Sequence, residues 1–490
     1  MQPAASSHAH WSSRFAFIMA AVGSAVGLGN FWRFPYQAGE NGGGAFVLVY
    51  VAAVVLIAIP VLFAELMIGR RTGVNAVGST QAVAKESGGS GVWGIAGGVG
   101  MLSAFLILSF YSVIAGWVMA YIPKAASGAL MGLDGDQVAQ VFTELTENPL
   151  QVIIWHTIFM GITVFIVARG LLGGIELAAK ILMPLFFLML LVMVGYSAYI
   201  GTQDCGAGQV CGLERAFDFL FTVDWNKITP ASTLAAIGQA FFSVGIGVAI
   251  MLTYGAYLNK ESNIPANGVL IAFSDTLVAI LAGLAIFPIV FATGQDPAAG
   301  PGLLFVTLPY SLGQMPAGEL IGTMFFTLAF FAALTSSISM LEIMTSWAEE
   351  HRGFRRLLGA ITGGFLAWLV GLGTVFSFSG WKDFHPFSFI PALKDATVFD
   401  SLDYLTGNFT MPVGGLLIAL LAGWVVRRQI VSEELRLPGI VLLVWRILLQ
   451  FFVPAALIFL LLTGLGIIQL TETGLCADFG FAKGCAAIWG

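Results

Sequence analysis

Charged residues are scarce in this chain of 490 residues, in which Asp, Glu, Lys and Arg together make up only 10%. Soluble domains carry about 25% charged residues, so the composition excludes a water-soluble globular protein. The net charge of −6 is spread thinly, and no nucleic-acid partner is expected because no basic region would bind one. Hydrophobic residues reach 58%, and the mean hydropathy is +0.90. These values indicate a protein that crosses a membrane several times.

The motifs of common enzymes are also lacking. No set of His and Glu residues has the spacing of a zinc site, no nucleophile elbow is present, and no Gly-rich stretch continues into Gly-Lys-Ser or Gly-Lys-Thr. An enzyme is therefore not expected. The polar segment before Trp11 has no basic cluster, so a cleaved signal peptide is not expected either.

Long apolar runs dominate the chain instead. About 20 apolar residues cross a bilayer, and by this measure the chain is predicted to span the membrane eleven times. The predicted spans are residues 14–38, 44–69, 92–123, 151–169, 174–200, 232–258, 265–293, 319–348, 357–378, 402–426 and 438–467. An all-α polytopic membrane protein is the predicted fold class.

The basic residues predict how these spans are oriented. If the N-terminus is cytoplasmic, the internal loops hold Arg70, Arg71, Lys85, Arg169, Lys180, Lys260, Arg352, Arg355, Arg356, Arg427, Arg428 and Arg436. The external loops then hold only Lys124, Arg215, Lys227, Lys382, Lys394 and Lys483. This bias satisfies the positive-inside rule. We therefore expect a multi-pass protein of the plasma (inner) membrane with a cytoplasmic N-terminus and an external C-terminus.

Cysteines are few, and all of them fall on the predicted external side, where disulfides persist. They are Cys205, Cys211, Cys476 and Cys485. We favour the pairs Cys205–Cys211 and Cys476–Cys485, although four cysteines allow three connectivities. Free thiols are the alternative.

Two predicted spans are interrupted in the middle. The first contains Gly23-Ser-Ala-Val-Gly-Leu-Gly-Asn-Phe-Trp-Arg-Phe-Pro35, and the sixth contains Gln239-Ala-Phe-Phe-Ser-Val-Gly-Ile-Gly247. Broken backbone at membrane depth is tolerated only where protein buries it or where it lines a wet cavity. The two breaks occupy equivalent positions in two halves of five spans each, which is the pattern of a transporter binding site within an inverted repeat.

The eighth span adds three consecutive hydroxyl side chains in Ala332-Ala-Leu-Thr-Ser-Ser337. Hydroxyl and carbonyl oxygens are the hard ligands that an alkali cation needs. The alternative is that these hydroxyls bond to carbonyls of their own helix turn, as Ser and Thr commonly do.

These segments, together with Asn41-Gly-Gly-Gly-Ala45, resemble in order and spacing the neurotransmitter:sodium symporter family, which includes the bacterial leucine transporter. The resemblance implies a five-plus-five inverted repeat with unwound spans one and six, plus one extra C-terminal span. The implied regions are an N-terminal tail (1–13), a first repeat (14–200), an external loop (201–231), a second repeat (232–426), an internal loop with span eleven (427–467) and an external tail (468–490).

The resemblance also implies two sodium sites. The first would use the Ala25 carbonyl, Asn30, Ser243, the carboxylate of the substrate, and a group at Ser274 or the adjacent Asp275. The second would use the carbonyls of Gly23, Val26 and Ala332 with the hydroxyls of Thr335 and Ser336. Carbonyls at half-helix C-termini carry the partial negative charge that suits a cation.

A substrate pocket is implied between the two breaks. Its expected residues are Ala25, Gly27, Gly29, Ile107, Tyr111, Phe242, Ser243, Gly245, Val248, Ser336 and Met340. Monoamine transporters of the family have an aspartate where this chain has Gly27, so a substrate with its own carboxylate fits better. Gly245 and Val248 replace larger residues of the leucine transporter, and Met340 can repack around varied shapes. A hydrophobic or aromatic amino acid is therefore expected.

Gates on both sides of the pocket are expected from the same resemblance. Arg33 and Asp403 match the outer gate pair, with Phe242 as a lid. Trp11 and Glu350 match inner-gate positions, but His8 replaces the usual arginine. Asp275 is predicted to supply the negative charge that animal members obtain from chloride, so chloride is not expected to be required.

The sequence therefore predicts a symporter that imports an amino acid with sodium, two ions being expected. The partners are the substrate, sodium and the lipid bilayer, and the chain is expected to be a monomer or a weak homo-oligomer. The alternative is a membrane sensor that binds an amino acid without significant transport. Retention of both sodium sites favours the symporter, because a sensor needs no ion coupling.

Overall fold

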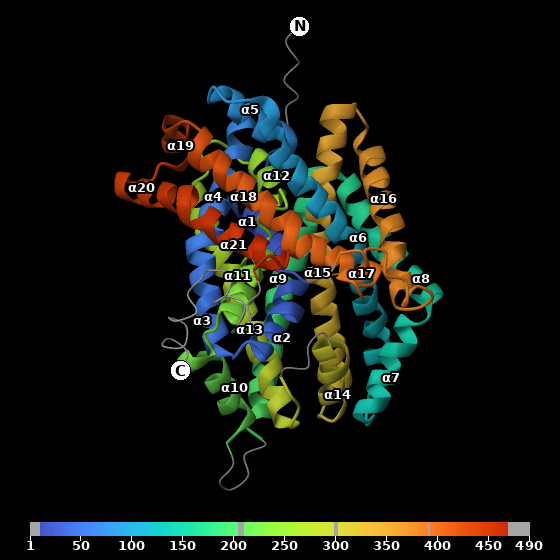
Figure 1. Ribbon diagram of the computed structural model, residues 1–490. Helices are drawn as coiled ribbons and strands as arrows, with labels where there is room; N and C mark the ends of the chain where they lie inside the picture. Colours follow the sequence, from blue (N-terminus) through green and yellow to red (C-terminus); the bar gives the residue numbers. More distant parts are fainter. Residues whose placement is uncertain (1–9, 204–209, 298–301, 391–392, 469–490) are drawn as a thin grey trace.

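The computed structural model describes residues 10–203, 210–297, 302–390 and 393–468, and the regular elements within these ranges are all helices (Figure 1). Nine of them are long and apolar enough to cross a membrane. They are Gly44–Thr72, Gly91–Ala126, Pro149–Ala168, Leu171–Gly201, Ile264–Ala292, Gly318–Arg352, Arg356–Ser377, Val398–Val425 and Gly439–Gly464.

The two remaining predicted spans are the interrupted ones. In the first, α1 (Arg14–Ala25) and the helix Gly29–Glu40, which ends in α2 (Phe34–Glu40), meet at an angle of 49°. In the sixth, α11 (Pro230–Val244) and α12 (Ile250–Ala256) are each shorter than a span. Both predicted breaks are therefore present as breaks between helices.

The broken helices lie inside the bundle (Figure 1). Its main elements are α3 (Gly44–Ala53), α4 (Ile59–Thr72), α6 (Gly94–Ala126), α8 (Pro149–Ala168), α9 (Leu177–Gly201), α13 (Ile264–Ala292), α15 (Gly318–Arg352) and α16 (Arg356–Ser377). Helix α1 packs against α9, α13 and α15, and α12 packs against α4. Unpaired backbone groups at the breaks are thereby covered by protein rather than lipid.

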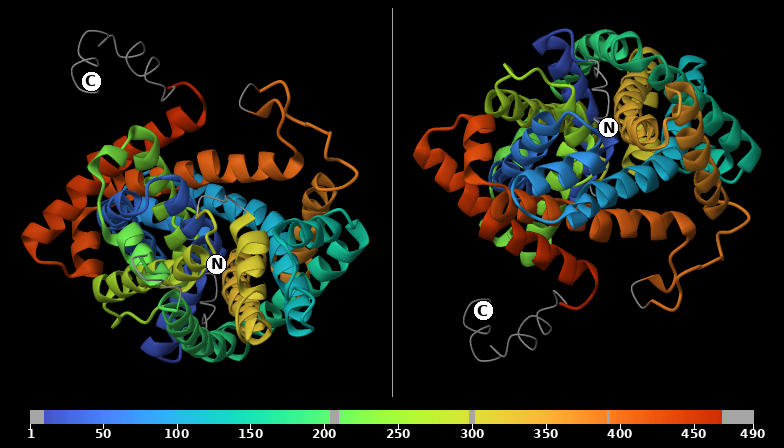
Figure 2. Two further views of the ribbon diagram at one scale, coloured as in Figure 1. Left: turned by 90° about the horizontal axis from the view of Figure 1, so that it is seen from below. Right: turned by 90° about the horizontal axis from the view of Figure 1, so that it is seen from above.

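The last two spans follow one another in the chain, and the tenth is more deeply buried than the eleventh. They consist of α17 (Val398–Leu405) with α18 (Met411–Leu420), and α20 (Gly439–Ile447) with α21 (Val453–Gly464), each pair joined by a π-helical turn. Seen along the bundle, α20 and α21 lie at one edge and α8 lies at the opposite edge (Figure 2). The surface of the last span, Gly439–Gly464, that faces lipid is apolar, as the exposed Ile440 and Phe451 illustrate.

Short helices outside the spans were not predicted. They are α5 (Ala76–Glu86), α7 (Gly135–Thr146), α10 (Gly212–Phe221), α14 (Leu308–Gly313) and α19 (Arg428–Leu435). Helix α7 has a complete capping box, in which Asp134 and Gln137 each accept a backbone N–H of the other, and this pairing stabilises a helix start.

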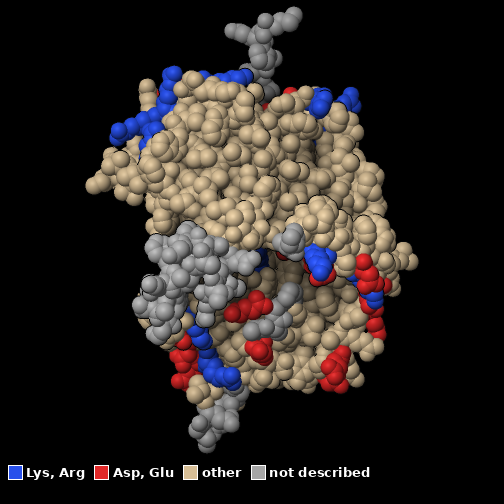
Figure 3. Space-filling model, in the orientation of Figure 1, with Lys and Arg blue, Asp and Glu red and all other residues tan. Residues whose placement is uncertain are grey.

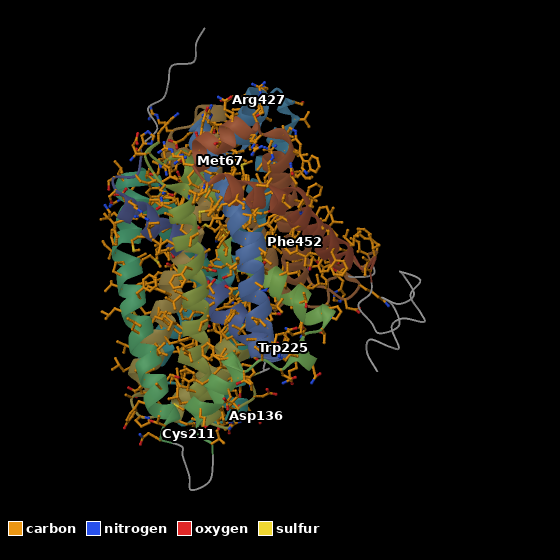
Figure 4. The ribbon with its side chains drawn as sticks, turned by 90° about the vertical axis from the view of Figure 1, so that its left-hand side faces the viewer. Met67, Asp136, Cys211, Trp225, Arg427 and Phe452 are labelled. Atoms are coloured by element: carbon orange, nitrogen blue, oxygen red, sulfur yellow. The ribbon has the colours of Figure 1, made fainter. Side chains whose placement is uncertain are left out.

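The two ends of the molecule differ in charge. Arg427 lies at one end, whereas Asp136, Cys211 and Trp225 lie at the other (Figure 4). Lys and Arg gather along the end that carries Arg427, and a broad band without charge separates them from the other charged residues on this face (Figure 3). Loops predicted to be internal and external thus lie at opposite ends. Which end faces the cytoplasm stays a prediction.

Cys211, at the start of α10, is disulfide-bonded. Free thiols are therefore wrong for this residue. Cys205, Cys476 and Cys485 lie outside the described residues, so the predicted connectivity stays a prediction.

Candidate functional site

The two breaks bring the ends of four half-helices together. Helix α1 ends at Ala25, and Val26 turns out of the helix with φ −72° and ψ 101°. Helix α11 ends at Gly245, whose φ of +69° is left-handed and costs a glycine little because it has no Cβ. The side-chain amide of Gln239 donates to the Gly29 carbonyl at 2.9 Å. This hydrogen bond joins the two interrupted spans directly.

A second contact holds the break of the sixth span in place. Glu65 of α4 is fully buried, and its Oε1 accepts the backbone N–H of Gly247 at 2.8 Å. This carboxylate satisfies a donor that the interruption of α11 and α12 leaves without a helical partner. Glu65 therefore has a structural role at this break.

A cavity of about 50 Å³ lies between the breaks. Every residue predicted for the substrate pocket except Ser243 lines it. The remaining lining residues, which the resemblance did not single out, are Ser24, Leu28, Ile250 and Met411. The cavity is thus formed mainly by apolar side chains and by the backbone of the first break.

Gly27 is tightly enclosed by this pocket. A Cβ on residue 27 would lie 2.7 Å from Ser336 Oγ and 3.0 Å from the Tyr111 hydroxyl oxygen. A side chain at residue 27 would therefore require Ser336 and Tyr111 to move, which disfavours the aspartate that pairs with amines in monoamine transporters. The Tyr111 hydroxyl accepts the backbone N–H of Leu28 at 3.3 Å, and Asn30 Oδ1 accepts that of Gly27 at 3.1 Å, so side chains satisfy two amides of the break.

Ser24 is the polar residue of this pocket that sequence reasoning missed. Its side chain is 6% exposed, and its Oγ has no hydrogen-bond partner among the described residues. The Ser24 carbonyl, by contrast, accepts a bond from Ser336 Oγ at 3.1 Å. A buried hydroxyl without a partner is costly, and no pattern in the sequence distinguishes Ser24 from a packing serine.

A cluster of oxygen-bearing side chains lies beside the pocket. Asn30 Nδ2 donates to Asp275 Oδ1 at 2.8 Å and to Ser243 Oγ at 3.1 Å. Ser243 Oγ donates to Asp275 Oδ2 at 2.6 Å, and the Tyr50 hydroxyl lies 3.2 Å from Ser243 Oγ. The residues come from the first break, α11, α13 and α3, so four separate spans converge on one carboxylate.

The residue that joins this cluster, Asp275, is one position later in the sequence than the residue that the family resemblance places there. The resemblance puts the sodium-binding asparagine of the family opposite Ser274, but the structure brings the next residue, Asp275, against Asn30 and Ser243. Ser274 is only half-buried, whereas Asp275 is fully buried. Tyr50, which the sequence did not single out, completes this cluster.

The charge of Asp275 makes the cluster suitable for a cation. None of the ion pairs among the described residues includes Asp275, and a buried carboxylate without a countercharge is costly. Rotation of the Asn30 side-chain amide by a half-turn would point its oxygen, in place of its nitrogen, toward a bound ion. The described residues contain no group of three or more His, Cys, Asp or Glu that could hold a metal. This all-oxygen set therefore fits a hard alkali ion rather than a transition metal.

The residues of the second implied sodium site also lie together. Helix α1 and α15 approach closely, because a Cβ on Gly23 would lie 3.2 Å from Thr335 Cβ. Thr335 Oγ1 donates to the carbonyls of Phe331 at 3.0 Å and Ala332 at 3.1 Å. Thr335, on the face of α15 that meets α1, thus bonds to carbonyls of its own helix turn. This is the alternative considered above for these hydroxyls.

The two sides of the pocket have different structures. We call the side that holds Arg33 and Asp403 the outer mouth and the side that holds Trp11 the inner mouth, following the predicted topology.

The outer mouth contains a cavity of about 380 Å³ lined by Arg33 and Asp403. Phe242 lines this cavity as well as the pocket, and the Arg33 guanidinium carbon lies 4.5 Å from the centre of its ring. No ion pair between Arg33 and Asp403 is found among the described residues.

The inner mouth is closed by Trp11. Its backbone N–H donates to the Tyr257 carbonyl at 3.2 Å and its Nε1 to the Tyr254 carbonyl at 3.1 Å. Its ring meets that of Tyr254 edge-on, with centroids 5.2 Å apart. The hydroxyl of Tyr257 donates to Glu342 Oε1 at 2.7 Å, and Glu342, which is fully buried, pairs with Arg356.

Glu350 contacts Asn75, the residue that caps the start of α5. It accepts the backbone N–H of Asn75 at 2.8 and 2.9 Å and is also bonded by the Asn75 side chain. His8 lies outside the described residues. A second ion pair, between Arg70 and Glu434 at 2.8 Å, ties α4 to α19 near the same end.

Comparison with known proteins shows the family of this chain. The sequence profile described as "Sodium:neurotransmitter symporter family" matches residues 8–134 and 136–393. A sodium-dependent transporter of Bacillus subtilis (strain 168) is 38% identical over 463 residues, which are 94% of this chain and 98% of the relative. A sodium-dependent transporter of Haemophilus influenzae is 35% identical over 434 residues, which are 86% and 90% of the two chains.

A solved structure matches the whole fold. The crystal structure of MhsT in complex with L-phenylalanine superposes with a TM-score of 0.84 and 39% sequence identity, covering 93% of this chain and 100% of that chain. The predicted leucine-transporter-like fold and the family resemblance are therefore confirmed. This chain belongs to the sodium:neurotransmitter symporter family and is a sodium-dependent, multi-pass membrane transporter.

Proposed function

We propose that this protein uses a sodium gradient to import a hydrophobic or aromatic amino acid by alternating access. The observation that carries the proposal is the position of the Asn30–Ser243–Asp275 cluster directly behind the pocket. Asn30 follows Gly29, and Ser243 follows Phe242, and both of these neighbours line the cavity. An ion at the cluster and a substrate in the pocket would therefore share a wall.

The chemistry of the pocket supports an apolar side chain on the substrate. Ile107, Val248 and Met340 are apolar, and no atom lies closer than 3.9 Å to a Cβ built on Gly245. Backbone amides at the first break, with the Tyr111 hydroxyl, would receive the carboxylate, which would take the place of the Asn30 Oδ1 that now accepts the Gly27 N–H. MhsT, which has the same fold, has been crystallised with L-phenylalanine.

Coupling follows from this arrangement. The substrate carboxylate would complete the coordination of sodium at the cluster, so each ligand would strengthen binding of the other by the same factor. The second ion would lie between α1 and α15, at Gly23, Val26, Ala332, Thr335 and Ser336. Two ions would then link both broken spans to the rest of the bundle, and their release on the low-sodium side would weaken substrate binding.

Asp275 would make the transporter independent of chloride. A fixed carboxylate at the first cluster balances the charge of the cation there, which is the task of chloride in animal members of the family. In an Asp275→Asn variant, uptake without chloride should fall by at least about tenfold, because a missing countercharge costs more than about 1.4 kcal/mol. Full activity of this variant without chloride would contradict the assignment.

The test of the function is uptake by the full chain in proteoliposomes. Radiolabelled glycine, alanine, leucine, phenylalanine and tryptophan are compared with an inward sodium gradient and with potassium in place of sodium. We expect sodium-dependent accumulation of leucine, phenylalanine or tryptophan. A preference for glycine or alanine would refute the substrate class. Sodium-dependent binding without accumulation would instead support an amino-acid sensor, for which the replacement of the inner-gate arginine would be the first explanation.

A further inference from the structure

A large groove lies away from the transport path, between α6, α15 and α16. Its volume is about 560 Å³, which exceeds that of the outer mouth. The groove is formed by the first turns of α6, the last turns of α15 and the first turns of α16. It therefore lies at the end of the bundle that holds the inner mouth.

One glycine leaves part of the groove open, and two others allow α16 to pack closely on α15. Gly98 of α6 and Gly359 and Gly363 of α16 line it. A Cβ on Gly98 would meet no atom within 4 Å, so the space above this residue is open. The remaining wall is apolar, as Met101 and Phe105 illustrate.

The groove opens toward lipid. Leu102 and Leu366, on its two edges, are 48% and 46% exposed. Both belong to helices that are long and apolar enough to cross a membrane. An occupant would therefore arrive from the bilayer and would need an apolar body.

One end of the groove is positively charged. Arg352 lines it and lies in the last turn of α15, where its guanidinium carbon is 5.9 Å from the centre of the Trp347 ring. Arg352 is exposed, and it takes part in none of the ion pairs among the described residues. A tryptophan and a cation at the end of a spanning helix are typical of the level of the lipid headgroups.

We propose that this groove binds one anionic phospholipid of the inner leaflet. Its phosphate would pair with Arg352, and one acyl chain would lie over Gly98 between α6 and α16. The charge favours an anionic headgroup, since a basic residue near the membrane surface contributes about 1 kcal/mol to the binding of anionic lipid. The proposal does not depend on which substrate is transported.

Native mass spectrometry and thermal unfolding of the full chain in detergent test this proposal. Phosphatidylglycerol and phosphatidylcholine with identical acyl chains are compared. We expect the wild-type chain to retain one phosphatidylglycerol molecule and to unfold at a higher temperature with it than with phosphatidylcholine. Equal retention of the two lipids, or an equal shift produced by inorganic phosphate alone, would refute an anionic phospholipid.

Two pairs of variants locate the site. Arg352→Gln should weaken retention of phosphatidylglycerol about fivefold, which corresponds to one headgroup contact, whereas Arg355→Gln, at an exposed arginine that does not line the groove, should not. Gly98→Leu should abolish retention by filling the space. Gly195→Leu on α9, where a Cβ also meets no atom within 4 Å, is its control. Loss of retention in either control variant, or normal retention in Gly98→Leu, would refute the location.

Discussion

The outer and inner mouths of the pocket are closed by different kinds of contact. At the outer mouth, the pocket borders a cavity of about 380 Å³, and Phe242 lines both together with Leu28, Gly29 and Tyr111. At the inner mouth, Trp11 donates two hydrogen bonds to backbone carbonyls, and a buried ion pair lies behind it. The pocket is therefore closed firmly at the inner mouth and only lightly at the outer mouth. A ligand that enters by the outer mouth requires this arrangement.

The difference lies in how much each closure contributes to the stability of the fold. Hydrogen bonds to charged partners contribute about 1.5–3 kcal/mol each when buried, and the inner mouth has several such contacts around Glu342 and Arg356. The outer pair, Arg33 and Asp403, faces an open cavity. Substitutions at the inner mouth should consequently change both stability and transport, and those at the outer mouth should change transport alone.

The largest expected effect is that of Glu342→Gln. The change removes the buried one of the two carboxylates that pair with Arg356, so it should lower the free energy of unfolding by about 2 kcal/mol and reduce uptake severely. Hydrogen exchange of residues 11–17, measured by mass spectrometry, should rise as the inner mouth loosens. Glu349→Gln is the control, because Glu349 pairs with the same arginine at 3.0 Å but is 33% exposed. Equal effects of the two variants would contradict the expectation that the buried partner of Arg356 contributes more than the exposed one.

Asp403→Asn should act on transport alone. The outer gate needs the carboxylate to pair with Arg33 as the mouth closes, so we expect uptake to fall by about tenfold, as for a lost contact of about 1.4 kcal/mol. The thermal unfolding midpoint should stay unchanged, since the described ion pairs do not include one between Arg33 and Asp403. A fall in the midpoint as large as that of Glu342→Gln would contradict the contrast between the mouths.

A smaller effect is expected between the two mouths, at Ser24. Its unpartnered hydroxyl should accept a hydrogen bond from an indole N–H or a phenol, so Ser24→Ala should weaken competition by tryptophan and tyrosine about fivefold, or about 1 kcal/mol. Competition by phenylalanine should not change. Ser197→Ala removes another buried hydroxyl without a partner, far from the pocket lining, and should affect none of the three. A uniform loss for all substrates in Ser24→Ala would refute the proposed hydrogen bond.

The smallest effect concerns the surface of the inner mouth. Hydrogen bonds from Arg71 hold the pKa of Glu86 below its usual range. The folded state thus gains stability above the usual Glu value of about 4.3, and it loses this stability as the pH falls through the lowered pKa. The pair is exposed, so Glu86→Gln should cost less than about 0.5 kcal/mol. Thermal unfolding as a function of pH would show the difference at pH 7 and its disappearance in acid; a difference that grows in acid would contradict it.

The sequence predicted those parts of the structure that local chemistry determines. Gly23–Pro35 and Gln239–Gly247 contain residues that an unbroken span does not tolerate, so both breaks could be located without coordinates. The pocket residues followed from the family resemblance. The resemblance left two adjacent residues, Ser274 and Asp275, as candidates, because an alignment without gaps does not show which of them faces the core.

Contacts between distant residues were not predictable. The pairs Glu342–Arg356 and Arg70–Glu434 join separate helices, and nothing near either residue in the sequence indicates its partner. Ser24 and Tyr50 look like packing residues of apolar spans until their neighbours are known. Helices α7 and α10 lie outside the spans, where hydropathy does not distinguish a short helix from a loop.

The position of the Phe242 ring, which lines both the outer cavity and the pocket, also has a kinetic consequence. Side-chain rotations take nanoseconds or less, whereas rearrangements of packed helices take microseconds to milliseconds or longer. Substrate should therefore reach the pocket quickly past Phe242, and the slow step of each cycle should be the separation of Trp11 from Tyr254 and Tyr257. Rapid mixing should accordingly reveal a burst of about one bound substrate per transporter before steady uptake begins.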